Sequence, residues 1–517
     1  MKKENENMAK ISKEDVKAAI DASPYPCIIH FDGKTLFELN KGKMLKRDRM
    51  AVLVSINGQT YLLGVPPLAS STGEDQFLGV MNLIKEYQLM SKTRGICFDT
   101  TSSNTGTNKG SVSRISQELD KYLLQIACRH HVTKLRMLHF WKLVTNEETS
   151  GPDNPLFKKL KNIFEEPNFN YNSVLLLRFD WNKVKSSFLE KAAMKSLTFC
   201  KAYVSKPGII RDDRSELAEL VVTYLSPITY KVRKTGAIHH ARFLGKAIYY
   251  LKLRLLSNQL TFVQENDKLK IEIKLITEFI VCFYAKWYLQ SEDVIKAPFL
   301  DITAINQMHL YKKVCTNPIA VDAVLESQYK HCWYLDSTMI PLALLDDELA
   351  SEEKAKIASA ILSFDMPSSD YYKPENKVKQ DIKEIYKMNT KIGKKPPSLS
   401  ALVDVFSYLI FDMIGFDKQR VQDWLSLPPN YWHTQSCFKS FQKYAETLIF
   451  VNDHSERSIG MMGQYIHRYS DETEKHNRLL TVDKVRSVFR SQEQKSGTIS
   501  KIKFNDGLGV MRKKIKS

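Results

Sequence analysis

The sequence lacks the features that mark membrane, secreted and fibrous proteins. No run approaches the ~18 uncharged apolar residues that a membrane-spanning helix needs, so we expect no membrane partner. Residues 1–6 carry no apolar signal core, which argues against secretion. The eight cysteines are scattered without a C-x-x-C pair, which predicts reduced thiols in the nucleus or the cytoplasm. Gly (20) and Pro (18) together make only 38 of 517 residues, as in a globular chain.

Common catalytic signatures are absent too. There is no P-loop, no G-x-S-x-G, no H-E-x-x-H and no dinucleotide fingerprint. Cys128 and His131 form a C-x-x-H pair, but a structural zinc site takes four ligands. The other adjacent Cys/His pair, His331 and Cys332, is distant in sequence. We therefore favour a place for His131 near phosphate or at a domain junction over a zinc site.

The charge is one-sided, with a net value of +18. This suits a polyanionic partner, because Lys and Arg displace counterions condensed on phosphates. A basic protein without such a partner is the alternative, and charge alone does not separate the two. Residues 484–517 hold ten Lys or Arg against two acids, Glu493 and Asp506. They predict a flexible tail that contacts nucleic acid or directs nuclear import, unless it is only a solvated terminus.

Apolar runs in the first quarter of the chain predict a sheet. Strands are expected at 26–32, 50–56, 60–65, 94–99 and 123–128. Asn57-Gly58 predicts a tight turn between the second and third strands. Helical spacing predicts helices at 71–89 and 109–122. Three antiparallel strands followed by helix, strand, helix and strand is the order of a ribonuclease-H-like α/β domain with a mixed five-stranded sheet.

Long helical patterns dominate the chain after this block. We predict a large all-α domain inserted into the ribonuclease-H-like domain, so that the whole chain is mostly helical. The expected parts are a polar helical lead (1–24), the first part of the ribonuclease-H-like domain (25–134), the helical insertion (135–437), return helices (438–490) and the basic tail (491–517).

Three acids in these elements are candidate metal ligands: Asp32, Asp99 and Glu456. The first two each end an apolar strand, where a lone buried carboxylate is costly. Glu456 opens a helix-like stretch. Mg²⁺, or alternatively Mn²⁺, would relieve the repulsion between such carboxylates, since it takes hard oxygen ligands. Two such ions would activate an attacking water and stabilise a leaving oxygen in phosphoryl transfer.

Each acid also has a structural alternative. Asp32-Gly33 is a turn signal, which the local pattern slightly favours. Asp99 is equally suited to an Asx turn into the following threonines. Asp453 and Glu456 match a capping box, which the local pattern favours over a metal role.

Seven segments share a pattern with known proteins: 30–34, 62–66, 97–106, 127–132, 239–242, 331–335 and 451–457. They resemble transposon-derived proteins of invertebrates, a set similar to the hAT superfamily of DDE transposases. The resemblance implies a ribonuclease-H-like domain interrupted by a helical insertion, Mg²⁺-dependent DNA cleavage and strand transfer, and a possible homo-oligomer. It makes Asp32, Asp99 and Glu456 the catalytic triad. His131, Arg457 and Asn104 would contact DNA or the phosphate.

The chain departs from that family at one point. Family transposases usually begin with a zinc-binding DNA-recognition finger, and the residues before Asp32 do not supply its ligands. The leading hypothesis is a nuclear DNA-cleaving protein. The second is a catalytically inactive, domesticated remnant that binds DNA or a protein, and the third is a helical interaction protein without a nucleic-acid role. Whether the chain is an enzyme stays open at this point.

Overall fold

The structure is a computed structural model of the 517-residue chain. It describes residues 2–40, 43–106, 109–148, 154–166, 169, 175–184, 186–206, 211–234, 244–378, 383–385, 387, 397–466, 469 and 471–496. The chain forms two compact units. The first comprises residues 1–128, 293–299 and 333–517, and the second comprises residues 129–292 and 300–332.

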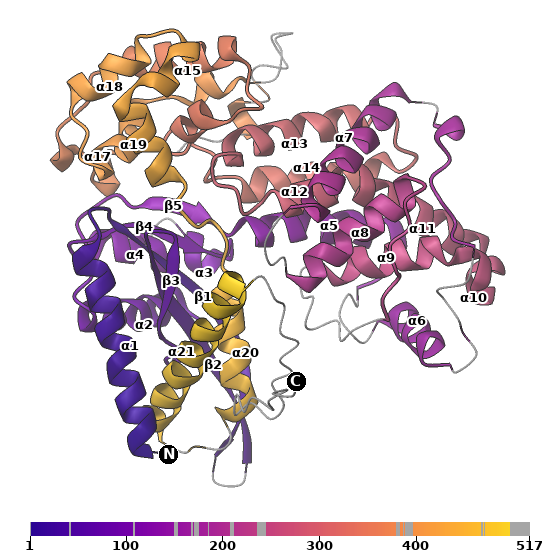
Figure 1. The fold of residues 1–517 in the computed structure, drawn as a ribbon, viewed down its shortest axis with the longest axis horizontal. Helices are drawn as coiled ribbons and strands as arrows, with labels where there is room; N and C mark the ends of the chain where they lie inside the picture. Colours follow the sequence, from indigo (N-terminus) through magenta and orange to yellow (C-terminus); the bar gives the residue numbers. More distant parts are fainter. Residues whose placement is uncertain are drawn as a thin grey trace. The chain divides into compact units, whose positions relative to one another are not determined.

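One mixed five-stranded sheet organises the first unit, with the order β3-β2-β1-β4-β5 (Figure 1). The strands are β1 (Cys27–Asn40), β2 (Lys43–Ile56), β3 (Gln59–Gly64), β4 (Thr93–Phe98) and β5 (Leu124–Ala127). β1 is antiparallel to β2 and β2 to β3, whereas β1, β4 and β5 are parallel neighbours. The predicted mixed sheet followed by a large helical region is thus confirmed.

The first two strands are longer than predicted. β1 and β2 each have 14 residues and stay in register from Ile28↔Ser55 to Asn40↔Lys43. Asp32 therefore lies inside β1, opposite Ala51, and the predicted turn at Asp32-Gly33 is wrong. Pairing with β2 keeps this segment extended despite its turn-like sequence. The turn at Asn57-Gly58 is confirmed, and both residues have the positive φ that such turns need.

Helices cover both faces of the sheet. On one face, α2 (Gly73–Glu86) and α4 (Ser111–Glu118) share a core with Ile29 and Phe31 of β1. On the other, α20 (Asp453–Tyr465) and α21 (Glu472–Ser496) share a core with Ala51 and Leu53 of β2. Burial on both faces explains why the central strands read as continuous apolar runs.

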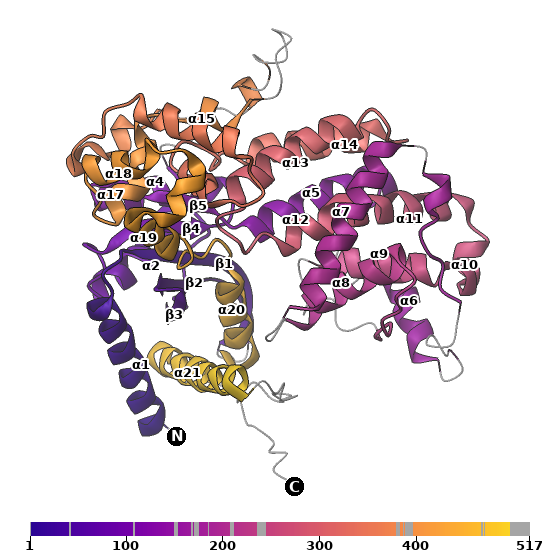
Figure 2. The same cartoon turned by 45° about the horizontal axis from the view of Figure 1, so that its top comes forward.

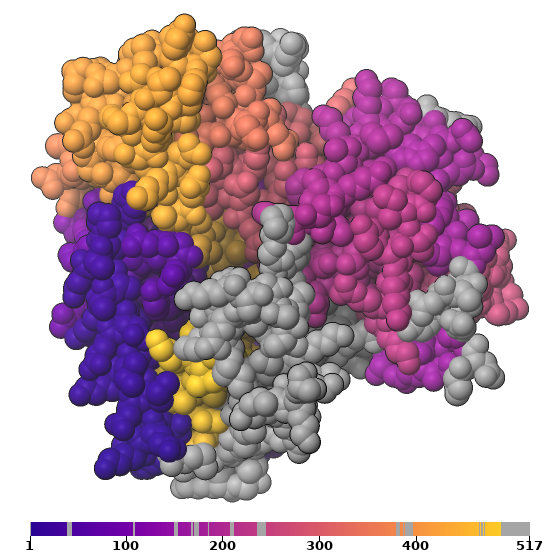
Figure 3. Space-filling model, viewed as in Figure 1, coloured from indigo at the N-terminus to yellow at the C-terminus, as the bar shows by residue number. Residues whose placement is uncertain are grey.

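The N-terminal helix contributes to both cores: Ala9 belongs to the one with α20 and α21, and Val16 and Ile20 belong to the one with α2 and α4. α1 (Lys2–Ala22) packs along α21, and Figures 1 and 2 show the two helices side by side. Figure 3 shows α1 on the surface of this unit, next to part of α21. Its pairing with α21 joins the two ends of the chain's described part in one layer.

The rest of the first unit consists of short helical segments. They are α3 (Ser102–Thr105), η5 (Ile340–Leu345), α15 (Ser351–Leu362), η6 (Ser369–Tyr371), η7 (Pro374–Asn376), η8 (Leu399–Leu402), η9 (Val405–Tyr408), α17 (Leu409–Met413), α18 (Lys418–Leu425), η10 (Pro429–Thr434) and α19 (Ser436–Ala445). Aromatic packing holds several of them, since Trp424 lies edge-on to Trp432 at 5.2 Å and also contacts Phe441.

The second unit is helical throughout its described residues. Its elements are α5 (Arg129–Thr145), α6 (Pro155–Glu165), η1 (Trp181–Lys183), α7 (Ser187–Val204), α8 (Asp212–Leu225), α9 (Gly245–Leu255), η3 (Ser257–Gln259), α10 (Thr261–Gln264), α11 (Asp267–Phe279), the π-helical η4 (Ile280–Tyr284), α12 (Ala285–Leu289), most of α13 (Ala297–Tyr311) and α14 (Pro318–His331). A buried ion cluster joins two of these helices: Asp301 of α13 lies 3.4 Å from Arg129 and 3.0 Å from Arg136, both of α5, and Arg136 also contacts Cys332 just after α14.

Some predictions concern residues that the structure does not describe. Residues 239–242 and 497–517 lie outside the described residues, and 491–496 of the predicted tail belong to α21. The predicted limits of the insertion, 135–437, stay a prediction, because compactness shows which segments pack together and not which segment is inserted. Over the described residues, the search for a helix with the length and apolarity to cross a membrane finds none.

Candidate functional site at the strand ends

Pairing among the three parallel strands stops at one edge of the sheet. β1 pairs with β4 as far as His30↔Cys97, and β4 pairs with β5 as far as Phe98↔Ala127. Asp32 and Asp99 both lie two residues beyond the His30↔Cys97 pair, at equivalent positions on neighbouring strands. The carboxyl ends of parallel strands are where open α/β sheets bind their ligands. The sheet therefore brings these two predicted site residues to the same edge.

Asp32 is a nearly buried carboxylate, with 8% of the residue exposed. Cys97 of β4, which pairs with His30, is fully buried. Burial raises the pKa of Cys97 well above its usual value, and the nearby Cys128 and Asp32 raise it further. A buried, uncharged thiol thus lies close to the Asp32 carboxylate at this edge.

Asp99 is half-buried and held by one of its two carboxylate oxygens. Oδ1 accepts from the backbone N–H of Thr101 at 3.3 Å, from the Thr101 hydroxyl at 2.8 Å and from the Asn104 amide at 2.5 Å. The predicted Asx turn is therefore present. Within the described part of the chain, no hydrogen bond or ion pair is found for Oδ2. Asp99 is fixed through one oxygen, which leaves the other for a ligand.

Asn104 is the residue that orients Asp99. It is buried on α3, and its Oδ1 accepts from the Ser111 hydroxyl at 3.0 Å while its amide donates to Asp99. Both ends of the amide are thus engaged. The predicted contact of Asn104 with phosphate stays a prediction, and the structure adds a positioning role that the sequence did not indicate.

A residue that the sequence did not single out ties the C-terminal segment to this edge. The Asn452 amide donates to the carbonyls of Phe31 at 2.9 Å and Cys97 at 3.4 Å. Its Oδ1 lies 3.1 Å from Nδ1 of His30, and its backbone N–H donates to Sγ of Cys128 at 3.3 Å. One buried residue thus bonds to Phe31 within β1, to Cys97 near the end of β4 and to Cys128 just after β5. Only its position just before the predicted Asp453 helix could have suggested it.

These bonds fix where α20 begins. The helix starts at Asp453, directly after Asn452, and Glu456 lies in its first turn. The N-cap is Asn452 and not the predicted Asp453, and the Asn452 side chain makes no capping bond because it bonds to the strands. Acidic residues in a first helical turn are favoured by the helix dipole. Glu456 is half-buried and lies four residues after Asn452, in this first turn.

His30 supports this junction from inside the sheet. It is buried, with Nε2 2.8 Å from the Ser55 hydroxyl and Nδ1 facing Asn452. Burial lowers the pKa of His30 to about 4, against the opposing hydrogen bond of Asn452, and His454 lowers it further. The ring is therefore neutral at pH 7, and it links β1 by hydrogen bonds to Ser55 of β2 and to Asn452.

Arg457 and His131 are the two other residues predicted to contact DNA, and each lies in the first turn or two of a helix. Arg457 is exposed on α20, one residue after Glu456. His131 is half-buried in the first turn of α5 and belongs to the second unit. Both contacts stay predictions.

The strand ends supply oxygen donors, the ligand type that Mg²⁺ prefers. As the described residues are placed, however, no three His, Cys, Asp or Glu side chains are grouped so that they could hold a metal ion. The donor chemistry fits the predicted ion, whereas the placement does not make a complete site. The predicted metal set of Asp32, Asp99 and Glu456 therefore stays a prediction.

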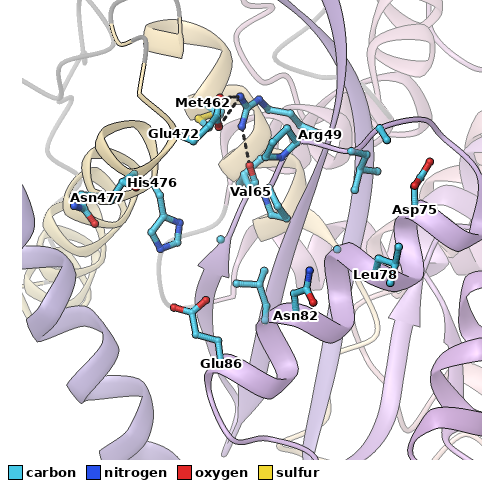
Figure 4. A pocket seen from close by; sticks show the side chains of 18 of the residues that line it. Arg49, Val65, Asp75, Leu78, Asn82, Glu86, Met462, Glu472, His476 and Asn477 are labelled. Atoms are coloured by element: carbon cyan, nitrogen blue, oxygen red, sulfur yellow. Dashed lines mark hydrogen bonds and ion pairs between the residues drawn. The ribbon is translucent and has the colours of Figure 1, made fainter.

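A pocket of about 530 Å³ lies elsewhere in the first unit, lined by β3 and its following loop, α2 and α21 (Figure 4). It contains none of the predicted site residues. Arg49 is its buried cation, and Figure 4 shows the guanidinium paired with Glu472 and bonded to the Val65 carbonyl. Because Arg49 also pairs with Glu38 at 2.6 Å, it is committed to structure and is not available to an anionic ligand.

A scan against protein-family models finds no match for this chain, and a search of the curated proteins finds none either. The hAT-like resemblance therefore rests on the sequence motifs.

Proposed function

We propose that this chain is a hAT-like, transposase-derived protein whose strand-end site cleaves and joins DNA. The observation that carries the proposal is the equivalent placement of Asp32 and Asp99, with the helix of Glu456 bonded to the same strands through Asn452. The sheet order and the helices on both faces are consistent with a ribonuclease-H-like domain. The net charge of +18 suits a DNA substrate and a place in the nucleus.

Each residue has a defined part in this proposal. Asp32, Asp99 and Glu456 would hold Mg²⁺, or Mn²⁺ in its place. When bound, the metal would supply Lewis-acid stabilisation of the phosphate oxygens. Asn104 keeps Asp99 in one orientation, and Asn452 keeps α20 on the strands. Such supporting bonds matter because misplacing a reacting group costs much of its rate.

Plasmid nicking by the full chain tests the proposal. Supercoiled DNA is incubated with Mg²⁺, with Mn²⁺ or with EDTA, and the nicked product is measured. Asp99→Asn is the sharp variant, because an amide oxygen can still accept the Asx-turn bonds while the charge is lost. We expect metal-dependent nicking that falls roughly 100-fold or more in this variant. Asp120→Asn, an exposed acid on the surface, is the matched control and should nick normally.

One outcome would defeat the assignment. If the Asp99→Asn protein nicks as fast as the unchanged chain, a contaminating nuclease or another site is responsible.

A second candidate function is favoured by a specific observation. The described residues hold no ready three-ligand metal group, and one oxygen of Asp99 is committed to an Asx turn. A domesticated remnant that binds DNA or a protein without cutting would have this arrangement. Salt-dependent DNA binding without any metal-dependent nicking would select this second function over the first.

A further inference from the structure

Two neighbouring helices of the second unit, α5 and α9, contain no Asp or Glu. The sequence from 220 to 264, which includes α9, holds seven Lys or Arg and no acid. The two helices touch, because Nε1 of Trp141 in α5 donates to the hydroxyl of Tyr250 in α9 at 2.8 Å. Cations on these helices therefore need acidic partners from other elements.

Some of these cations have such partners and others do not. Lys252 lies 2.7 Å from Glu216, and the two arginines of α5 share Asp301. Lys142 and Lys246 differ from them. Within the part of the chain that the structure describes, neither of these two lysines takes part in an ion pair.

Lys246 lies over the ring of Trp141. Its Nζ is 5.4 Å from the ring centroid, and the residue is half-buried. Lys142 follows Trp141 in α5, and Lys134 lies seven residues before Trp141, which is two helical turns and so the same face. Burial, and then the charges of Lys134 and Lys142, lower the pKa of Lys246 to about 8. Two further cations therefore act on one half-buried ammonium group.

This arrangement is unfavourable for the chain alone. Desolvation and the repulsion of like charges both disfavour the charged form of Lys246. Lys246 is also in the first turn of α9, where the helix dipole disfavours a cation. The contact with the Trp141 ring offsets only part of these costs. An anion bound among the ammonium groups would reduce both the repulsion and the cost of burial.

We propose that Lys134, Lys142 and Lys246, here called the lysine cluster, bind a compact anion with two or more phosphate groups. The phosphates could be those of an inorganic polyphosphate or of a nucleotide. Cations gathered around one half-buried ammonium group fit a small anion of high charge better than a nucleic-acid backbone, whose charges are spread along a line. The inference goes beyond the proposed function and does not depend on DNA cleavage.

Isothermal titration calorimetry of the full chain with sodium tripolyphosphate, in metal-free buffer, tests this. Lys246→Met should weaken binding about 10- to 100-fold, because one charge-assisted hydrogen bond is lost while an apolar stem still covers Trp141. Lys246→Arg keeps the charge and should keep most of the affinity. Lys46→Met is the matched control: Lys46 lies 5.7 Å from the ring centroid of Phe37 in the first unit, so the same charge is lost far from the cluster in sequence.

Chemical labelling gives a second measurement that needs no variant. Acetic anhydride acetylates accessible amines, and mass spectrometry of peptides locates the products. Saturating tripolyphosphate should slow the acetylation of Lys142 and Lys246 and leave that of Lys46 unchanged. Equal protection of all three lysines would show general screening of charge and would overturn the lysine cluster.

The remaining outcomes separate the possible ligands. Affinity for ATP as well as tripolyphosphate identifies nucleotides as a source of the phosphates, whereas affinity for tripolyphosphate alone identifies inorganic polyphosphate; both support the proposal. Equal affinity in Lys246→Met and Lys46→Met contradicts it. Binding of single-stranded DNA that is lost in Lys246→Met, without any tripolyphosphate binding, would assign the cluster to nucleic acid and also overturn the proposal. Circular dichroism melts confirm that the variants fold.

Discussion

At the scale of single residues, Asn452 and His30 account for why a helix more than 400 residues away begins at the strand ends. Asn452 has no charge and makes its bonds inside the sheet, where an unmade hydrogen bond costs about 1–3 kcal/mol. His30 completes the set by linking Asn452 to Ser55. Neutral hydrogen bonds thus hold this junction.

The neutral state of His30 gives a stability that depends on pH. Its pKa is about 4 in the folded chain and about 6.5 when unfolded, so the unfolded chain binds more protons between these values. Stability is therefore fully present above pH 6.5 and declines as pH falls to 4, by up to about 3 kcal/mol from this group. Urea unfolding in EDTA should show this loss in the unchanged chain and a flatter profile in His30→Gln.

The comparison needs a control because other groups titrate in the same range. His433→Gln, at an exposed histidine, should follow the profile of the unchanged chain. A His30→Gln profile as steep as that of the His433 variant would refute the assignment of the buried neutral ring.

The sequence predicted two residues of this site. It indicated Asp32 and Asp99 because apolar runs that end in an acid predict strand ends, and it offered the Asx turn as an alternative for Asp99. It misjudged Asp32 as a turn residue and Asp453 as a cap. Both errors have one cause: the partners that decide these conformations, β2 and the strand carbonyls, are remote in sequence.

At the scale of elements, a buried ion cluster joins the hairpin of β1 and β2 to α21. Arg49 is fully buried and lies 2.6 Å from Glu38 and 2.9 Å from Glu472, while Lys475 is 3.2 Å from Glu38. Burial acts to raise the pKa of the Glu38 carboxyl, but Arg49 and Lys475 outweigh it and hold the pKa below its ordinary value. The cluster explains why a polar stretch of β1 and β2 stays extended, which its composition did not predict.

Removing the central cation should release α21 from the sheet. We expect Arg49→Met to destabilise this contact by about 3 kcal/mol, because the buried Glu38 loses its nearest partner and keeps only Lys475 at 3.2 Å. Hydrogen exchange followed by mass spectrometry should show faster exchange in the peptides of α21. Lys85→Ala breaks an exposed pair with Glu118 and should change exchange very little. Unchanged protection of α21 in Arg49→Met would show that apolar packing alone holds the helix.

At the scale of the whole molecule, sequence periodicity predicted helices but did not show to which of the two compact units each helix belongs. The segments from 333 to 450 pack with the sheet unit, although their patterns resemble those of the helices in the second unit. The reason is physical: an amphipathic pattern shows that a face is buried and does not show against what. The mixed sheet was easier to predict, since strand order follows from short connections and a turn signal.

The central proposal for the whole molecule is that Asp32, Asp99 and Glu456 together bind a divalent cation. Electron paramagnetic resonance of Mn²⁺ added to the full chain tests this most directly, because free and bound ions are distinguished without any assumption about the substrate. We predict one or two bound Mn²⁺ per chain, lost in Asp99→Asn and in Asp32→Asn and retained in Asp120→Asn. Equal Mn²⁺ binding by all four proteins, or none by the unchanged chain, would contradict the account.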